Sequence, residues 1–195
     1  MQTTTLDLGP PTAEVSRVVA GVRDDQLTGP TPCEGMPVAA LLDHLVGLTV
    51  AFRLAAEKAD LPGGPSADAS HLAPDWRTRL PAQLAALAAA WREPSAWVGT
   101  AEVAGVRMPA PAMAAVAVDE VLVHGWDLAA ATGQDYRPDP ASVQACLEMV
   151  GDRGDATDEP AGLFGPVVPV PEDAPPFERL LGRTGRDPRW SPPSR

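Results

Sequence analysis

The hydrophobic residues of this chain recur at helical spacing along most of its length. Four valines form the apolar stripe of a predicted amphipathic helix over residues 12–27. Leucines spaced three and four apart predict a second helix over residues 37–59. A third stripe predicts a helix over residues 76–91, although Pro81 must start, kink or interrupt it because proline lacks the backbone donor.

The second half of the chain continues this pattern and adds shorter pieces. An apolar run predicts a fourth helix over residues 112–132, which stops at Gly133. Asp139 and Pro140 are a good N-cap and first-turn pair for a fifth helix that ends at Gly151. The remaining expectations are a small hairpin turned at Ala104-Gly105, a solvated charged loop over 152–159, a Pro-rich irregular segment over 164–170, a short helix over 173–182 and an extended tail over 185–195.

These elements predict an all-α fold, a four-helix bundle with an extra helix and an irregular Pro-rich C-terminal segment. The chain has 195 residues, of which 45% are hydrophobic, so we expect one domain over residues 1–195 with a full core. Helical bundles build metal and ligand sites from inward-facing positions of different helices. Polar residues on the inner helix faces are therefore the candidates for chemistry.

Three such residues interrupt the apolar run of the fourth predicted helix. Glu120, His124 and Asp127 are spaced i, i+4 and i+7, so they fall within about 60° of one another on one helix face. An ionisable side chain taken out of water is costly unless it is paired, hydrogen-bonded or bound to a metal. The cluster therefore requires a partner, and a metal ion is the sharpest candidate.

His44 on the second predicted helix is the candidate for a third ligand. It lies on a flank of small residues, which leaves room for either a pocket or a close helix contact. Two imidazoles and one carboxylate suit zinc above all, or nickel, iron or manganese, with positions open for water or substrate. We therefore predict a metal site of His44, Glu120 and His124, in which Asp127 orients a ligand, accepts a proton as a catalytic group, or binds substrate.

Plainer interpretations stay open for each of these residues. Glu120, His124 and Asp127 can form a buried ion cluster without a metal, with His44 a satisfied histidine at the edge of the core. Cys33 is either a reactive thiol near the open end of the bundle or a small buried residue beside a turn. His71 lies in a polar loop and is not expected to be a ligand. Arg186 and Asp187 are expected to form a local ion pair.

Composition narrows the classes of partner. The formal net charge of −11 disfavours nucleic acid and anionic lipid, and no cluster of basic residues offsets it. The two cysteines form no disulfide framework and the N-terminus carries no export signal, so we expect a cytoplasmic protein. No apolar stretch is expected to cross a membrane. We therefore expect a small-molecule substrate. The protein is expected to be a monomer or a homodimer.

Several sequence blocks resemble a known family. They are Thr31-Pro32-Cys33-Glu34-Gly35, Leu41-Leu42-Asp43-His44, the run EVLVHGWDLAA over 120–130, Thr132-Gly133-Gln134, and the ending from Phe164 to Trp190. The chain is similar to the DinB-like superfamily of metal-binding four-helix bundles, in the actinobacterial branch of the N-terminal domain of mycothiol-dependent maleylpyruvate isomerase. The resemblance implies that His44, Glu120 and His124 are the metal ligands. It also implies a low-molecular-weight thiol, such as mycothiol, as cosubstrate.

The reaction is less defined than the site. Met36-Pro37 departs from the family pattern, and the isomerases carry a second domain that contributes to the active site, whereas the fourth predicted helix ends near Thr132 of 195 residues. The leading hypothesis is a metal-dependent thiol transferase or isomerase that acts on a small molecule. The alternatives are a hydrolase or tailoring enzyme that uses metal-bound water, and a metal-binding or small-molecule-binding protein without catalysis.

Overall fold

The fold is mostly helical, as predicted. The computed structural model describes residues 6–59, 64–151 and 164–193. Its α-helices are α1 (Gly9–Ala20), α2 (Val38–Ala56), α3 (Trp76–Ala90), α4 (Ala110–Thr132), α5 (Pro140–Val150) and α6 (Pro176–Arg183). Shorter elements are the 3₁₀ helices η1 (Asp24–Gln26), η2 (Ala69–His71) and η3 (Pro94–Trp97), and the strands β1 (Thr100–Val103) and β2 (Val106–Pro109).

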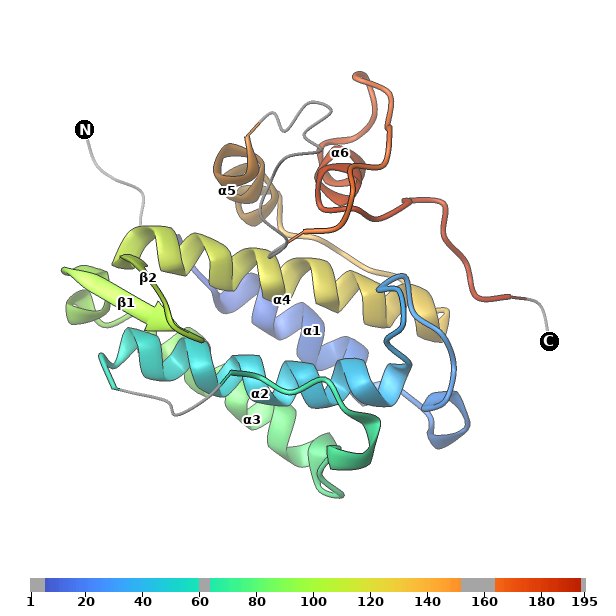
Figure 1. Ribbon diagram of the computed structural model, residues 1–195, viewed down its shortest axis with the longest axis horizontal. Helices are drawn as coiled ribbons and strands as arrows, with labels where there is room; N and C mark the ends of the chain where they lie inside the picture. Colours follow the sequence, from blue (N-terminus) through green and yellow to red (C-terminus); the bar gives the residue numbers. More distant parts are fainter. Residues whose placement is uncertain (1–5, 60–63, 152–163, 194–195) are drawn as a thin grey trace.

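Helices α1 to α4 form the bundle (Figure 1). Helices α1 and α2 each pack against both α3 and α4, so the second and fourth helices are neighbours, as the ligand hypothesis requires. Trp76 and Trp91 lie in the hydrophobic core. The extra helix α5 packs on α4 outside the bundle, and α6 packs on α5.

The first helix differs from the prediction at its ends, and the third helix is not interrupted at Pro81. Helix α1 begins earlier because its first turn holds prolines, whose missing donors cost nothing there, and it ends at Ala20. The turn that follows is held by Gln26, whose amide donates to the Thr132 carbonyl at 2.9 Å. Helix α3 continues through Pro81, and the carbonyl left without a helical donor belongs to the exposed Arg77.

The predicted hairpin is present and closes one end of the bundle. Strands β1 and β2 pair antiparallel with Val103 opposite Val106, and the hairpin contacts both α2 and α4. Ala104 and Gly105 both have positive φ, 50° and 81°, as a two-residue hairpin turn of this hand requires. In Figure 1 the hairpin lies beside the first residues of α4.

The described segment before α6 is held against the end of α6 by backbone contacts. Val168 donates its amide to the Gly182 carbonyl at 2.9 Å. Gly165 and Gly185 approach so closely that a Cβ on Gly185, where φ is +84°, would lie 2.8 Å from the Gly165 Cα. These contacts place residues 165–168 beside the end of α6. The predicted charged loop over 152–159 lies outside the described residues.

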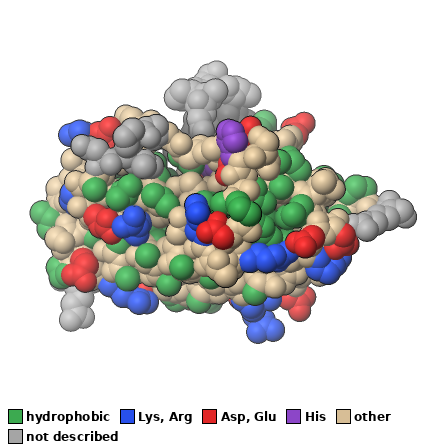
Figure 2. All heavy atoms as spheres, turned by 90° about the horizontal axis from the view of Figure 1, so that it is seen from below, with side chains coloured by type: hydrophobic (Ala, Val, Ile, Leu, Met, Phe, Trp, Pro, Cys, Tyr) green, Lys and Arg blue, Asp and Glu red, His purple; other side chains and the backbone are tan. Residues whose placement is uncertain are grey.

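Among the described residues, one helix meets the length and composition criteria for a membrane span. Helix α2 is long and apolar enough to cross a membrane by length and composition, because its only charged residues are Asp43 and Arg53. However, 67% of its most apolar window is buried inside the bundle, which accounts for the hydropathy. The molecular face in Figure 2 carries acidic and basic side chains intermixed with hydrophobic ones.

Candidate metal centre

The three predicted ligands meet where α2 faces α4. Glu120 Oε2 lies 3.3 Å from His124 Nε2 on its own helix and 3.7 Å from His44 Nε2 on α2. The ligand atoms of all three residues lie within 4.8 Å of one another. The imidazole rings of His44 and His124 stand edge to face with centroids 5.0 Å apart. The structure thus brings together the residues that the sequence could only place on two separate helices.

Both imidazoles are oriented by a partner on their other ring nitrogen. His44 Nδ1 lies 3.3 Å from the Ser66 carbonyl oxygen, and His124 Nδ1 lies 2.9 Å from Asp127 Oδ2. The loop that supplies Ser66 is tied to α2 because Asp68 donates its amide to Asp43 at 3.2 Å. With Nδ1 as the donor, each ring presents Nε2 as a ligand atom toward Glu120. This is the arrangement of metal-binding histidines in proteins.

The expectation that Arg186 pairs locally with Asp187 is wrong. Arg186 Nη2 lies 3.1 Å from Asp127 Oδ2, whereas Asp187 pairs with Arg189 at 3.1 Å. The Asp127 side chain is fully buried and accepts from both Arg186 and His124. The pair forms because the backbone amide of Arg186 donates to the Leu181 carbonyl at the end of α6, which turns the chain toward α4. No local pattern predicts this contact.

Cys33 lies beside the candidate metal centre, whereas His71 is not part of it. Cys33 Sγ lies 3.9 Å from Arg186 Nη2 and borders the site. Cys33, His124 and Asp127 also form a group with the spacing of metal ligands, but the Arg186 guanidinium already supplies a positive charge there. His71 is two-thirds exposed, with Asp68 at 4.0 Å, and belongs to neither group.

A cavity of about 480 Å³ opens beside the three ligands. His44, Glu120 and His124 form one part of its wall, together with Cys33 and Arg186. The rest is lined by apolar side chains of α2, α4 and the hairpin, and by residues of three connecting segments, namely Met36, Pro65, Phe164 and Gly165. The small-residue flank of α2 serves in part as a close contact, since a Cβ on Gly47 would lie 3.0 Å from Pro65 Cβ. A small molecule that enters the cavity therefore meets the candidate ligands directly.

Comparison with known proteins identifies the family. The family model for the mycothiol maleylpyruvate isomerase N-terminal domain matches residues 8–129. The chain belongs to this family. Two uncharacterized proteins of Mycobacterium tuberculosis, from strains CDC 1551 and H37Rv, are each 32% identical to it over 180 residues, which span 87% of this chain and 91% of theirs.

Solved structures agree on the fold. The crystal structure of the mycothiol-dependent maleylpyruvate isomerase matches with a TM-score of 0.57 at 17% identity. A histidine-to-alanine mutant of that isomerase matches with a TM-score of 0.51 at 18% identity. Each match covers 73% of this chain and 66% of the other. The resemblance to the DinB-like branch and the four-helix bundle are thereby confirmed.

In this member of the mycothiol maleylpyruvate isomerase N-terminal domain family, the charges at the site favour a bound cation. Burial opposes ionisation of Glu120, but hydrogen bonds from His124 and His44 hold its pKa below the usual range. Burial also opposes a charged His124, yet Asp127 and Glu120 raise its pKa to about 9. The two carboxylates thus favour the protonated, positively charged form of His124. A divalent cation bound at Nε2 would take the place of that proton as the source of positive charge.

Sequence reasoning missed one further acidic residue beside the site. Asp119 is 3% exposed, and its Oδ1 has no hydrogen-bond partner among the described residues. Burial and the neighbouring charge of Glu120 raise the pKa of Asp119 to about 7. The thiol of Cys146 on α5 lies against it, and burial raises the pKa of that thiol above its ordinary value. Asp119 interacts with Cys146 of α5 and does not line the cavity, so it is outside the candidate centre.

Proposed function

We propose that this protein is a divalent-metal-dependent enzyme that activates a low-molecular-weight thiol of the mycothiol type for transfer to, or isomerisation of, a small molecule. His44, Glu120 and His124 are the proposed ligands, with zinc as the preferred ion. The observation that carries the proposal is the convergence of two oriented Nε2 atoms on one Glu120 oxygen, at 3.3 and 3.7 Å, in the wall of a cavity. Membership in a family named for a mycothiol-dependent isomerase supports the thiol.

Each protein group has a distinct task in this proposal. A bound divalent cation lowers the pKa of a coordinated thiol or water, and so supplies a nucleophile at neutral pH. Asp127 is a positioning residue, because its fully buried carboxylate contacts His124 Nδ1 and does not line the cavity. Arg186 holds that carboxylate in place from the other side at 3.1 Å. Glu120 is the ligand whose negative charge most directly offsets that of the cation.

The first experiment is elemental analysis of the full-length protein, purified without chelators and without a metal-binding tag. We expect about one equivalent of transition metal in the parent protein. The variants His44→Ala and His124→Ala should lose it. The matched control is His71→Ala, which removes the remaining, exposed histidine and should keep the metal. Absence of metal from the parent, even after zinc is added back, would overturn the proposed site.

A second experiment separates thiol chemistry from the alternatives. The zinc-loaded protein is incubated with thiol-reactive electrophiles in the presence and absence of mycothiol, and products are followed by mass spectrometry. Turnover that requires mycothiol supports the proposal. Hydrolysis without a thiol would replace it with chemistry of metal-bound water, and recovery of every compound intact would favour a binding protein.

A further inference from the structure

The cavity is an elongated slot with one reactive end. Leu48 and Phe52 lie one and two turns beyond His44 on α2. Val116 and Met113 lie about one and two turns before Glu120 on α4. Both rows therefore lead away from the ligands toward the hairpin, where Val103, Val106 and Met108 complete the wall. The slot joins a polar, ligand-lined end to a long apolar end.

Charge is confined to the reactive end. Apart from the three ligands, the ionisable groups among the described lining residues are Cys33 and Arg186. Burial raises the pKa of the Cys33 thiol, which keeps it neutral. The Arg186 charge is already balanced by Asp127 at 3.1 Å. An anionic group placed in the apolar end would lose its hydration and would meet no cationic side chain among the described residues that line that end.

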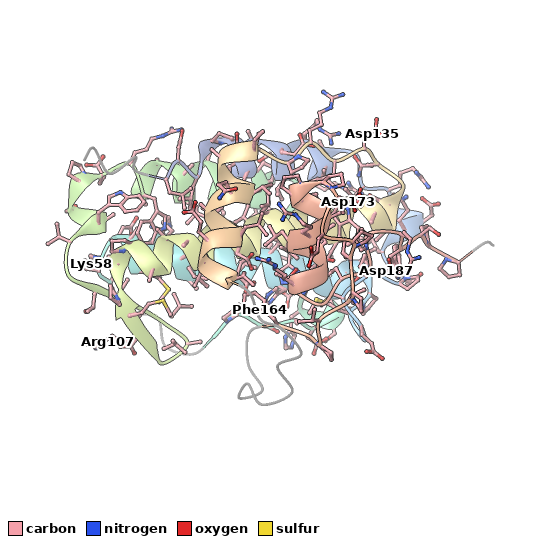
Figure 3. All side chains as sticks on the ribbon, turned by 90° about the horizontal axis from the view of Figure 1, so that it is seen from above. Lys58, Arg107, Asp135, Phe164, Asp173 and Asp187 are labelled. Atoms are coloured by element: carbon pink, nitrogen blue, oxygen red, sulfur yellow. The ribbon has the colours of Figure 1, made fainter. Side chains whose placement is uncertain are left out.

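Two other basic residues lie close by but face a second cavity. Lys58 and Arg107 line a hollow of about 410 Å³ on the other side of the hairpin. Lys58 donates to the Ala96 carbonyl at 2.8 Å, and Arg107 pairs with Glu102 at 2.8 Å. Both lie at the hairpin end of the molecule in Figure 3, whereas Phe164, which borders the slot, lies nearer the middle. Neither is part of the slot's wall.

We propose that the slot binds the aliphatic or aromatic portion of an uncharged, thiol-reactive substrate and places its electrophilic atom beside His44, Glu120 and His124. This inference rests on the proposed thiol-dependent function and assigns its second substrate. A dicarboxylate such as maleylpyruvate, for which the crystallised relative is named, could place one carboxylate at the ligand end, but its other carboxylate would find no counter-charge among the described residues of the apolar end. Three methionines, Met36, Met108 and Met113, line the slot, and their flexible thioethers accommodate apolar groups of more than one shape.

The test is a displacement series on the zinc-loaded, full-length protein. A neutral apolar fluorophore, N-phenyl-1-naphthylamine, is bound and then displaced by 1-butanol, 1-hexanol, 1-octanol or maleate. We expect the alcohols to bind roughly four-fold more tightly per added methylene until the slot is full. Maleate should displace nothing. A series without dependence on chain length, or displacement by maleate as effective as by hexanol, would overturn the proposal.

Two variants tie the series to this slot. Val116→Phe shortens the apolar end, so the best alcohol should become a shorter one, which a general loss of folding would not produce. The control Val98→Phe changes a valine that is 70% exposed and outside the wall, and should leave the series unchanged. An unchanged series in Val116→Phe would overturn the assignment to the slot.

The metal analysis and the displacement series fail independently. A protein that holds zinc but shows a flat series overturns the apolar slot and leaves the proposed chemistry standing. A protein that shows the series but holds no metal overturns the thiol chemistry, and with it the role of the slot in placing an electrophile.

Discussion

Mutation of the buried pair of Asp127 and Arg186 should change both the stability of the protein and its metal affinity, and the two changes can be measured separately. The Asp127 side chain is fully buried and the Arg186 side chain is 11% exposed. Asp127→Asn keeps the size of the side chain but leaves the arginine without its counter-charge. Removal of one partner of a buried ion pair typically costs about 3–5 kcal/mol, and the remaining amide contacts place this variant near 3 kcal/mol. Urea unfolding of the metal-free protein measures this loss.

The same substitution should weaken metal binding through His124. Asp127 Oδ2 accepts from His124 Nδ1 at 2.9 Å, and loss of such an outer partner typically lowers metal affinity by about 10- to 100-fold. A neutral amide still accepts from the ring, so we expect about tenfold. Competition with a chromophoric zinc chelator measures the dissociation constant. The pair of Asp187 and Arg189 at the surface supplies the control, since Asp187→Asn should leave stability close to that of the parent protein.

A double variant distinguishes positioning from simple destabilisation. Asp127→Asn with Arg186→Met removes both charges, so much of the lost stability should return. Zinc affinity should stay low, because His124 still lacks its carboxylate. Recovery of zinc affinity together with stability would refute the positioning role, as would parental affinity in the single variant.

Three further predictions concern other parts of the molecule. Burial raises the pKa of Asp119 to about 7, above its unfolded value, so this residue lowers the stability of the protein as pH rises from about 4 to 7. Relative to the parent, metal-free Asp119→Asn should therefore gain up to about 4 kcal/mol of stability across that window, as measured by urea unfolding at each pH. A difference between variant and parent that stays constant with pH would contradict this prediction. Gly125→Ala should lower stability by about 1–3 kcal/mol in thermal unfolding, because a Cβ there would lie 2.5 Å from Val15 Cγ2 and 2.7 Å from Tyr136 Oη. A variant as stable as the parent would show that α1 shifts to make room for the added methyl group. Iodoacetamide should alkylate Cys33 more slowly than free cysteine at pH 7, because burial raises the pKa of its thiol, and peptide mass spectrometry would reveal the contrary.

Local sequence pattern placed the candidate residues of α4 more completely than any other part of the candidate site. Glu120, His124 and Asp127 are covalently spaced on one helix, so the helical repeat alone places them on one face. Gly133 in the left-handed conformation ends that helix where predicted, and Asp139 caps α5 through the Ser142 amide. These features depend on residues close together in the chain, which is why local pattern was sufficient.

Contacts between distant segments were decided only by the tertiary structure. His44 is a proposed ligand whose Nε2 lies 3.7 Å from Glu120 Oε2 only because α2 packs on α4, and no local pattern gives that distance. Arg186 lies 59 residues from Asp127 and was assigned to the wrong partner, because a guanidinium on a long side chain pairs with whatever carboxylate the fold brings near. The apolar slot likewise combines two helices with a hairpin. Sequence alone determined which faces were polar or apolar; the packing of those faces determined which charges met and what shape of cavity remained between them.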